Sequence, residues 1–247
     1  MNPFNKKPLQ ATLRDMSEST FKKFSDLIYS KFGILMTDNK RELLKNRLSK
    51  LLYQLDFKSY ESYYQHLKTR PPSHPDLEQF ISAITTNVTY FFREDQQLAI
   101  LRDKIIPELP RERPLHIWSA GCSTGAEPYT LNIIFQDHYP LSSQVRIHAT
   151  DISQKVLREG IRGVYPASAL ENVPDYMIKK HFKRGINTQK NFFKVREHLT
   201  RNISFSQFNL LEIPYSFPLH FDIIFCRNVM IYFDTPTRDL IIKNLLN

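Results

Sequence analysis

Cysteines and long apolar runs are scarce in this sequence, and each shortage excludes a class of protein. Only two cysteines, Cys122 and Cys226, occur among the 247 residues, which argues against a disulfide framework and against a metal site built from several thiolates. No apolar stretch approaches the roughly 18 to 20 residues of a membrane helix, and residues 1 to 7 lead into no signal-peptide core. We therefore expect a cytoplasmic protein that is not inserted in a membrane and holds no metal.

Clusters of basic residues are also missing, although the formal net charge is +9. Such a charge biases a protein toward anionic partners, which include nucleic acid, an acidic membrane surface and an acidic protein segment. The Lys and Arg residues are spread along the chain without a run of five, which weakens the case for nucleic acid. An ordinary solvated surface explains the charge equally well.

Residues 17 to 108 show the apolar periodicity of helices. Phe21, Phe24 and Ile28 recur at spacings of three and four, and Gly33 follows where a helix would end. Two adjacent prolines at positions 71 and 72 interrupt the set, since they cannot continue a helix. We expect a helical N-terminal domain and linker over residues 1 to 85, and further helices at about 38–54, 59–69, 76–86 and 95–108.

From Pro114 onward, short β-rich runs alternate with helical stretches, which is typical of βαβ units and a parallel sheet. Residues 86 to 247 are therefore expected to form an α/β domain with a parallel sheet. The segment 165–202 is long for a simple crossover, and we expect a small inserted β-subdomain at about 170–202. The expected strands are Leu115 to Trp118, Val145 to Thr150, Ile203 to Phe208 and Phe221 to Cys226.

The stretch AGCSTGAEP, residues 120–128, lies between a predicted strand and a predicted helix. Small residues at the carboxyl end of a strand let a ligand approach the backbone. The stretch matches neither the P-loop pattern nor G-x-G-x-x-G. Glu127 would repel a pyrophosphate but would favour the cationic end of an adenosylated amino acid. The alternative is an ordinary turn, with Glu127 as a first-turn helix acid.

Polar residues follow the other predicted strands as well. Asp151 ends the second strand, where a nucleotide-type ligand would present its ribose hydroxyls, although it could equally be the N-cap of the next helix. Polar groups directly after buried strands suggest a lined cleft, because they are costly to bury without partners. The segment TTNVTYFFRE, residues 85–94, resembles a loop that folds over a ligand. The remaining strand-end residues are Asn209, Arg227 and Asn228.

With these pieces assembled, the sequence resembles the CheR family of S-adenosylmethionine-dependent chemotaxis receptor methyltransferases, which esterify glutamate side chains. NVTYFFRE, WSAGCSTGAEPYTL, ATDIS, GVYP, FNLL and FDIIFCRNVMIYF occur in the family's order, from about residue 20 to the end of the chain. The resemblance implies a helical domain joined to a doubly wound methyltransferase domain with an inserted β-subdomain. It also implies S-adenosylmethionine as the cofactor, with S-adenosylhomocysteine as its product.

Four groups of residues match the family's cofactor contacts: a covering segment, two acids, a pair beside the adenine and a pair near the methionine portion. In that order they are Asn87, Thr89 and Arg93; Glu127 and Asp151; Asn209 and Leu210; and Arg227 and Asn228. Gly121 is also expected to be a cofactor-binding residue, because a glycine in this turn lets the backbone approach the ligand.

The resemblance further implies that Tyr232, together with Arg93, lies close to the transferred methyl group. On chemical grounds Arg93 would orient the substrate carboxylate, since a guanidinium pairs with it bidentately. Tyr232 would position the nucleophilic oxygen. A glutamate is already ionised at neutral pH, with a reference pKa of about 4.3, so no general base is needed.

The helix expected at residues 38–54 has basic residues beside its leucine stripe. The family's substrate is the helical cytoplasmic part of a chemoreceptor, so Lys45, Arg47 and Lys50 could dock against its acidic residues. Solvated charges beside a core stripe are an equal alternative.

Two departures from the family pattern matter. Family members often have a second glutamate where this chain has Ala126, so cofactor binding is expected to be weaker. The chain ends at IIKNLLN, where family members usually continue into final strands, and we expect these strands to be missing and a sheet edge to be exposed.

Two rival functions stay open at this point. One is a non-catalytic module that binds S-adenosylmethionine for signalling. The other is a nucleic-acid methyltransferase, which the charge favours. CRNVMIYF, residues 226–233, disfavours it, because amino-methylating enzymes usually carry an Asn/Asp-Pro-Pro-aromatic motif at this strand end and no catalytic Pro-Cys pair is present.

Overall fold

A computed structural model describes residues 15–85 and 87–246 of the chain. Residues 1 to 7, where the sequence predicts no signal-peptide core, lie outside these described residues. The described chain divides into two compact units. Unit 1 contains residues 15–85 and 231–243, and unit 2 contains residues 87–230 and 244–246. The polypeptide therefore builds most of unit 1, then unit 2, and returns to unit 1 at residue 231.

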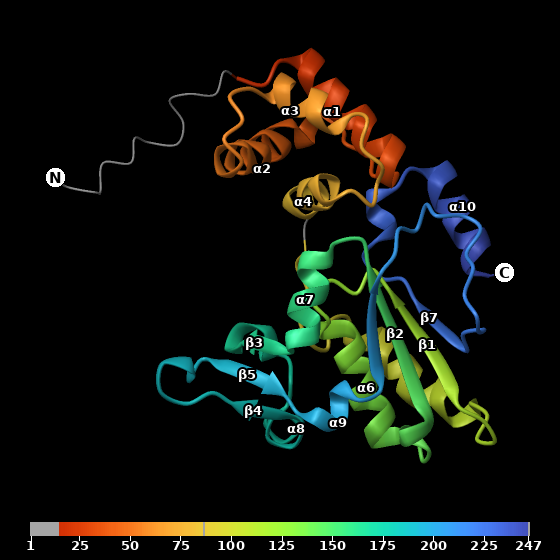
Figure 1. Ribbon diagram of the computed structural model, residues 1–247. Helices are drawn as coiled ribbons and strands as arrows, with labels where there is room; N and C mark the ends of the chain where they lie inside the picture. Colours follow the sequence, from red (N-terminus) through yellow and green to blue (C-terminus); the bar gives the residue numbers. More distant parts are fainter. Residues whose placement is uncertain (1–14, 86, 247) are drawn as a thin grey trace. The chain divides into compact units, whose positions relative to one another are not determined.

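Unit 1 is a cluster of helices, as the apolar periodicity predicts (Figure 1). Aromatic side chains lie in its core. The first helix begins where Ser17 caps it and ends at Gly33, which has a φ of 67°. The ring of Phe24 lies 5.8 Å from that of Phe80 and 6.4 Å from that of Tyr63, so one ring joins three helices. The helices of this part of the unit are α1 (Glu18–Phe32), α2 (Arg41–Gln54), α3 (Tyr60–Leu67) and α4 (Pro75–Ile84), with a 3₁₀ turn (Asp38–Lys40) before α2, and the Phe24 ring joins α1, α3 and α4.

The segment 231–243, which the sequence analysis placed in the second domain, completes unit 1. The N–H of Leu35 donates to the carbonyl of Tyr232 at 2.9 Å. The hydroxyl of Tyr29 donates to the Asp234 carboxylate at 2.8 Å. Both bonds join the end of α1 to the residues before α10 (Thr235–Leu245). The helical unit is therefore made of two stretches that are far apart in the sequence.

Unit 2 is built on a four-stranded parallel sheet with the order β6-β2-β1-β7 (Figure 1). Ile117 of the central strand lies opposite Ile147 on one side and Ile223 on the other. The strands consist largely of apolar residues, which is typical of parallel strands that are covered on both faces. The strands are β1 (Leu115–Ala120), β2 (Val145–Asp151), β6 (Ile203–Gln207) and β7 (Ile223–Phe225).

The strand order decides which elements cover each face of this sheet. Right-handed crossovers that step in one direction from β1 to β2 to β6 place α6 (Ala126–His138) and α7 (Gln154–Arg162) on the same side. The step from β6 to β7 reverses direction, so the segment 208–222 covers the opposite face. Trp118 is buried on that face. Its ring lies 4.8–5.6 Å from four others: Phe208, Tyr215, Phe217 and Phe221.

The stretch 95–108, predicted as one helix, is divided in the structure. It consists of α5 (Asp95–Ile100), a π-helical turn (Leu101–Ile105) and a 3₁₀ turn (Ile106–Glu108). Pro107 has no N–H to continue an α-helical ladder, which accounts for the irregular end. No helix in the described part of the chain is long and apolar enough to cross a bilayer.

The predicted inserted subdomain is present, and its first strand begins at residue 164 rather than about 170. Three antiparallel strands pair in the order β3-β5-β4. The ring of Phe91 packs edge-on against Tyr165 and Phe182, at 4.9 and 5.1 Å, and so ties the subdomain to the segment before α5. The elements are β3 (Val164–Pro166), α8 (Asp175–His181), β4 (Phe182–Arg184), β5 (Phe192–Val195) and α9 (Glu197–Thr200).

Candidate functional site

The carboxyl ends of the parallel strands in unit 2 meet at one edge of the sheet, and the turn after β1 lies there. The N–H groups of Gly121 and Cys122 both donate to the carbonyl of Thr150, at 2.8 Å each. Gly121 has a φ of 78°, and a Cβ at this position would overlap Cγ2 of Val229. Only glycine satisfies both conditions, so the turn brings the ends of β1, β2 and β7 close together.

Asp151, at the end of β2, is buried and bonded to the turn. Its Oδ2 accepts the N–H of Ser123 at 2.9 Å, and its Oδ1 accepts the N–H of Ser153 at 3.0 Å. Burial raises the pKa of Asp151, and these backbone bonds oppose the rise. The alternative in which Asp151 caps the next helix is wrong, because the N-cap of α7 is Ser153. A carboxylate has about four acceptor sites, so Asp151 retains capacity for ligand hydroxyls.

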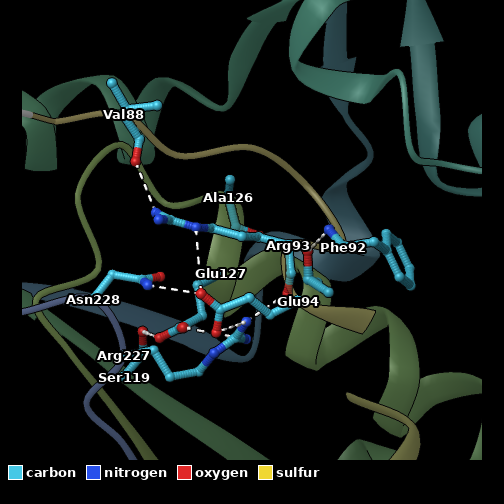
Figure 2. Close-up of polar contacts among 10 residues, drawn as sticks. Val88, Phe92, Arg93, Glu94, Ser119, Ala126, Glu127, Arg227 and Asn228 are labelled. Carbon is cyan, nitrogen blue, oxygen red and sulfur yellow. Dashed lines mark hydrogen bonds and ion pairs between the residues drawn. The ribbon is translucent and has the colours of Figure 1, made fainter. Parts of the chain in front are cut away.

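Glu127 lies in the first turn of α6 and is held from two sides (Figure 2). Its Oε1 accepts the Ser119 hydroxyl at 2.7 Å, and its Oε2 lies 3.6 Å from Nη1 of Arg227. Burial raises the pKa of Glu127, while the Ser119 hydroxyl and the Arg227 charge lower it. Glu127 is therefore a first-turn acid that also contacts other residues of the site, and its contact with the cofactor stays a prediction.

Glu94, which the sequence analysis did not single out, joins Arg227 and Asn228 to the covering segment (Figure 2). The Asn228 amide donates to Oε1 of Glu94 at 2.7 Å, and Nη2 of Arg227 donates to Oε2 at 3.3 Å. The Asn228 hydrogen bond and then Arg227 hold the pKa of Glu94 below its ordinary value. The sequence offered one indication of this role, because Glu94 directly follows Arg93 at the end of the segment 85–94.

One nitrogen of the Arg227 guanidinium has no acceptor in the described residues. The side chain is 10% exposed, and its Nε is buried without a hydrogen-bond partner. Its Nη2 also donates to the carbonyl of Arg93. A buried donor without a partner costs about 1–3 kcal/mol. The cluster therefore suits a ligand that brings an oxygen acceptor, such as a carboxylate.

Arg93 lies on the covering segment, next to this cluster (Figure 2). Its Nη1 donates to the carbonyl of Val88 at 3.1 Å, and its guanidinium lies 5.8 Å from the centre of the Tyr90 ring. The backbone is fixed beside it, because the N–H of Phe92 donates to the hydroxyl of Thr130 on α6 at 3.2 Å. Arg93 therefore has a set position while its side chain is partly exposed.

The other two predicted residues of the covering segment lie against the turn. The carbonyl of Asn87 accepts the Ser123 hydroxyl at 3.3 Å. Thr89 lines a cavity of about 620 Å³ together with Thr124 of the turn. The segment and the turn therefore contact each other within unit 2.

Four non-glycine residues around this site have a left-handed backbone. Phe92, Glu94, Ser123 and Asn228 have φ values of 56°, 56°, 51° and 58°. Such conformations cost of order 1–3 kcal/mol each and persist only where the surroundings impose them. Their concentration in the segment, the turn and the residues after β7 is typical of a functional site.

Asn209 and Leu210 form a tight turn after β6. The side-chain oxygen of Asn209 accepts the N–H of Leu211 at 3.1 Å. The carbonyl of Leu210 accepts the Tyr215 hydroxyl at 2.8 Å. Both predicted residues are buried, and the two hydrogen bonds hold this turn at the carboxyl end of β6.

The predicted residues Tyr232, Lys45, Arg47 and Lys50 all belong to unit 1. The ammonium of Lys45 lies 2.8 Å from the carboxylate of Asp15. Arg47 donates to the carbonyl of Ile84, at the end of α4. Lys50 is exposed on α2. Two of the three proposed docking cations therefore already have partners within their own unit.

Comparisons with known proteins match nearly the whole chain. The family model described as "CheR methyltransferase, SAM binding domain" matches residues 87–247, and "CheR methyltransferase, all-alpha domain" matches residues 19–85. A chemotaxis protein methyltransferase of Borreliella burgdorferi is 38% identical over 86% of this chain and 77% of its own length. Chemotaxis protein methyltransferase 2 of Pseudomonas aeruginosa is 38% identical over 92% and 80%. The chemotaxis protein methyltransferase of Salmonella typhimurium is 35% identical over 96% and 82%.

Proposed function

Because the chain belongs to the CheR methyltransferase family, we propose that it methylates glutamate side chains in the cytoplasmic helices of chemoreceptors. It is an S-adenosylmethionine-dependent chemotaxis protein methyltransferase. The acceptor group and the residues that serve it are inferred from the chemistry of the site. Since the proposed acceptor helices lie in the cytoplasm, the protein would act there.

The observation that carries this proposal is the buried cluster around Arg227. Glu94 and Glu127 hold the guanidinium, and its Nε lacks an acceptor within the described residues. The amino-acid part of S-adenosylmethionine has a carboxylate and an ammonium group. Arg227 would hold the carboxylate and Glu127 the ammonium, so the residues fit the cofactor.

The remaining cofactor-binding residues divide by the part of the molecule they would hold. Asp151 would accept the ribose hydroxyls, because its carboxylate lies at the end of β2 and has free lone pairs. Asn209 and Leu210 would lie beside the adenine, and Gly121 would let the backbone approach the ligand. Asn87, Thr89 and Arg93 of the covering segment would close over the ligand. Asn228 would lie with Arg227 near the methionine portion.

The cofactor supplies an activated methyl group, and the protein supplies alignment. Arg93 would orient the acceptor carboxylate with two N–H groups, and Tyr232 would position the attacking oxygen. No proton has to be removed, because a glutamate with a pKa of about 4.3 is ionised at neutral pH. Exclusion of water from the site completes the contribution of the protein.

We propose that receptor docking through α2 depends mainly on one of the three cations that the sequence suggests. Lys45 and Arg47 are held by Asp15 and by the Ile84 carbonyl. Lys50 is exposed and would make the main electrostatic contact with acidic receptor residues. Surface contacts of this kind change affinity modestly.

Transfer of a labelled methyl group to receptor-containing membranes tests these roles. Arg93→Ala should lower kcat about 100-fold, because the acceptor is no longer oriented. Lys45→Ala should leave kcat within about threefold, since its ion pair with Asp15 is exposed and weak. Calorimetric titration with S-adenosylmethionine accompanies the assay, and binding should be lost in Asp151→Ala. Equal losses of kcat in the Arg93 and Lys45 variants would contradict the assigned roles.

A further inference from the structure

Glu94 lies at the start of helix α5, yet its side chain does not serve that helix. The residue is the N-cap of α5, and its carboxylate accepts no hydrogen bond from the first turn. A cap residue in its usual role would satisfy one of the free N–H groups there. The φ of 56° at Glu94 also costs free energy, because the residue is not glycine. The local fold of α5 therefore does not explain why a glutamate occupies this position.

Both oxygens of the Glu94 carboxylate are used by residues that follow β7 (Figure 2). Oε1 accepts the Asn228 amide at 2.7 Å, and Oε2 accepts Nη2 of Arg227 at 3.3 Å. The Arg227 side chain is 10% exposed, whereas that of Glu94 is 35% exposed. The carboxylate is therefore anchored from its inner side, by the two residues that we propose to lie near the methionine portion of the cofactor.

The same carboxylate faces the guanidinium of Arg93, which we propose to orient the acceptor (Figure 2). Nε of Arg93 lies 3.8 Å from Oε1 of Glu94, and Nη1 donates to the carbonyl of Val88 at 3.1 Å. A guanidinium can pair bidentately with a carboxylate through Nε and one Nη, or through its two Nη groups. Because Glu94 faces the Nε edge, the edge formed by the two Nη groups is left for an incoming carboxylate.

The backbone around Arg93 is fixed independently of the Glu94 carboxylate. The N–H of Phe92 donates to the hydroxyl of Thr130 at 3.2 Å, and the carbonyl of Arg93 accepts Nη2 of Arg227. In the part of the chain that the structure describes, Glu94 is the one carboxylate at ion-pair distance from the Arg93 guanidinium. Loss of the Glu94 charge would therefore free the guanidinium and leave the backbone in place.

We propose that Glu94 is a positioning residue for methyl transfer, which selects the edge of Arg93 that meets the acceptor carboxylate. It also ties that guanidinium to Arg227 and Asn228, so the acceptor side and the cofactor side of the site share one carboxylate. The inference rests on the proposed function, in which Arg93 orients the acceptor. Glu94 acts through Arg93 and contacts neither ligand itself.

A double-mutant cycle tests whether Glu94 acts through Arg93. Glu94→Gln keeps the side-chain length and an oxygen acceptor but removes the charge. Transfer of a labelled methyl group to receptor-containing membranes should show kcat about tenfold lower, because the guanidinium can turn and misalign the acceptor. In the Arg93→Ala background, the same replacement should change kcat less than about twofold, since the residue through which Glu94 acts is absent.

Cofactor binding separates this positioning role from a general disturbance of the site. Calorimetric titration of Glu94→Gln should give a Kd for S-adenosylmethionine within about threefold of the native value, because Arg227 keeps Glu127 as a partner. A structural collapse of the site would instead weaken cofactor binding together with kcat. Glu171→Gln is the matched control, since it makes the same chemical change at an exposed position of unit 2 and should alter neither value.

Reaction of Arg93 with phenylglyoxal gives a readout that requires no turnover. A guanidinium whose Nε edge is paired with a carboxylate is restrained, so Arg93 should be modified about threefold faster in Glu94→Gln than in the native protein. Mass spectrometry of peptides measures the rate at each arginine. Arg102 is the internal reference, because its ion pair with Asp103 at 2.6 Å is the same in both proteins.

Either of two results would overturn the positioning role. One is the same proportional loss of kcat from Glu94→Gln in the native and Arg93→Ala backgrounds. The other is an unchanged rate of Arg93 modification in Glu94→Gln. Failure of the proposed function is a different result, in which the native protein binds S-adenosylmethionine but transfers no methyl group to receptor glutamates. The modification rate then still decides whether Glu94 restrains Arg93.

Discussion

The Ser119 hydroxyl donates to the buried Glu127 and stabilises its ionised form, so we expect this contact to influence how the site responds to acid. The pKa of Glu127 is raised above its ordinary value of 4.5 by burial, and the Ser119 hydroxyl opposes that rise. Under the proposed role of Glu127, its protonation removes the attraction for the cofactor ammonium, so affinity should fall as the pH falls through the raised pKa. Ser119→Ala removes the opposing hydrogen bond and should move this acid limb to higher pH.

Calorimetric titration with S-adenosylmethionine between about pH 5 and 8 measures the shift. Ser204→Ala is a matched control, because it removes a hydroxyl from the exposed strand β6. Glu127→Gln should abolish the part of the pH dependence that Ser119 controls, although the buried Asp151 also titrates. If the fall of affinity at low pH occurs at the same pH in Ser119→Ala as in the native protein, the proposed role of Ser119 is wrong.

Single residues of the site were predictable where a sequence pattern fixes a position at a strand end. Asp151 follows a predicted strand directly, and Glu127 lies where the turn after another predicted strand enters a helix, so the pattern places both at one edge of the sheet. Glu94 and Ser119 were missed because they act through other side chains. Glu94 contacts Arg227, which is 133 residues away in the sequence, and no local pattern indicates such a contact.

At the scale of elements, the turn after β1 depends on a close approach to the residues after β7. Gly121→Ala introduces a Cβ at a φ of 78° and against Val229. Unfolding in urea should show a loss of about 1–3 kcal/mol. Gly121→Ala/Val229→Ala relieves the overlap but not the backbone strain, so it should be more stable than the sum of the two single variants. If the losses of unfolding free energy in the two single variants add up to that of the double variant, the overlap with Val229 does not contribute to the destabilisation.

Elements with strong periodicity were predicted well, and those fixed by long-range packing were not. The stripe of Phe21, Phe24 and Ile28 and the stop at Gly33 correctly place α1. The stretch 95–108 has helical spacing throughout, yet Pro107 and packing break it into three pieces. The assignment of residues 231–243 to the helical unit depends on hydrogen bonds to α1, which the local sequence does not reveal.

For the whole molecule, the net charge of +9 predicts that encounter with the proposed receptor substrate depends on salt. Raising KCl from about 50 to 300 mM shortens the Debye length from about 14 to 6 Å and screens exposed charges. The KM for receptor membranes should rise several-fold, while the Kd for S-adenosylmethionine should stay within about twofold because its contacts are buried. Parallel titrations at both salt concentrations check this, and a KM that does not respond to salt would contradict it.

The two-part composition of unit 1 has a consequence for synthesis on the ribosome. The hydrogen bond between Tyr29 and Asp234 joins residues 205 positions apart, so α1 is made long before its partner exists. Residues 87–230 emerge in between and can form their own core first. Contacts of such long separation slow folding. The surface of helices α1 to α4 that packs against residues 231–243 therefore stays uncovered until those residues have been synthesised.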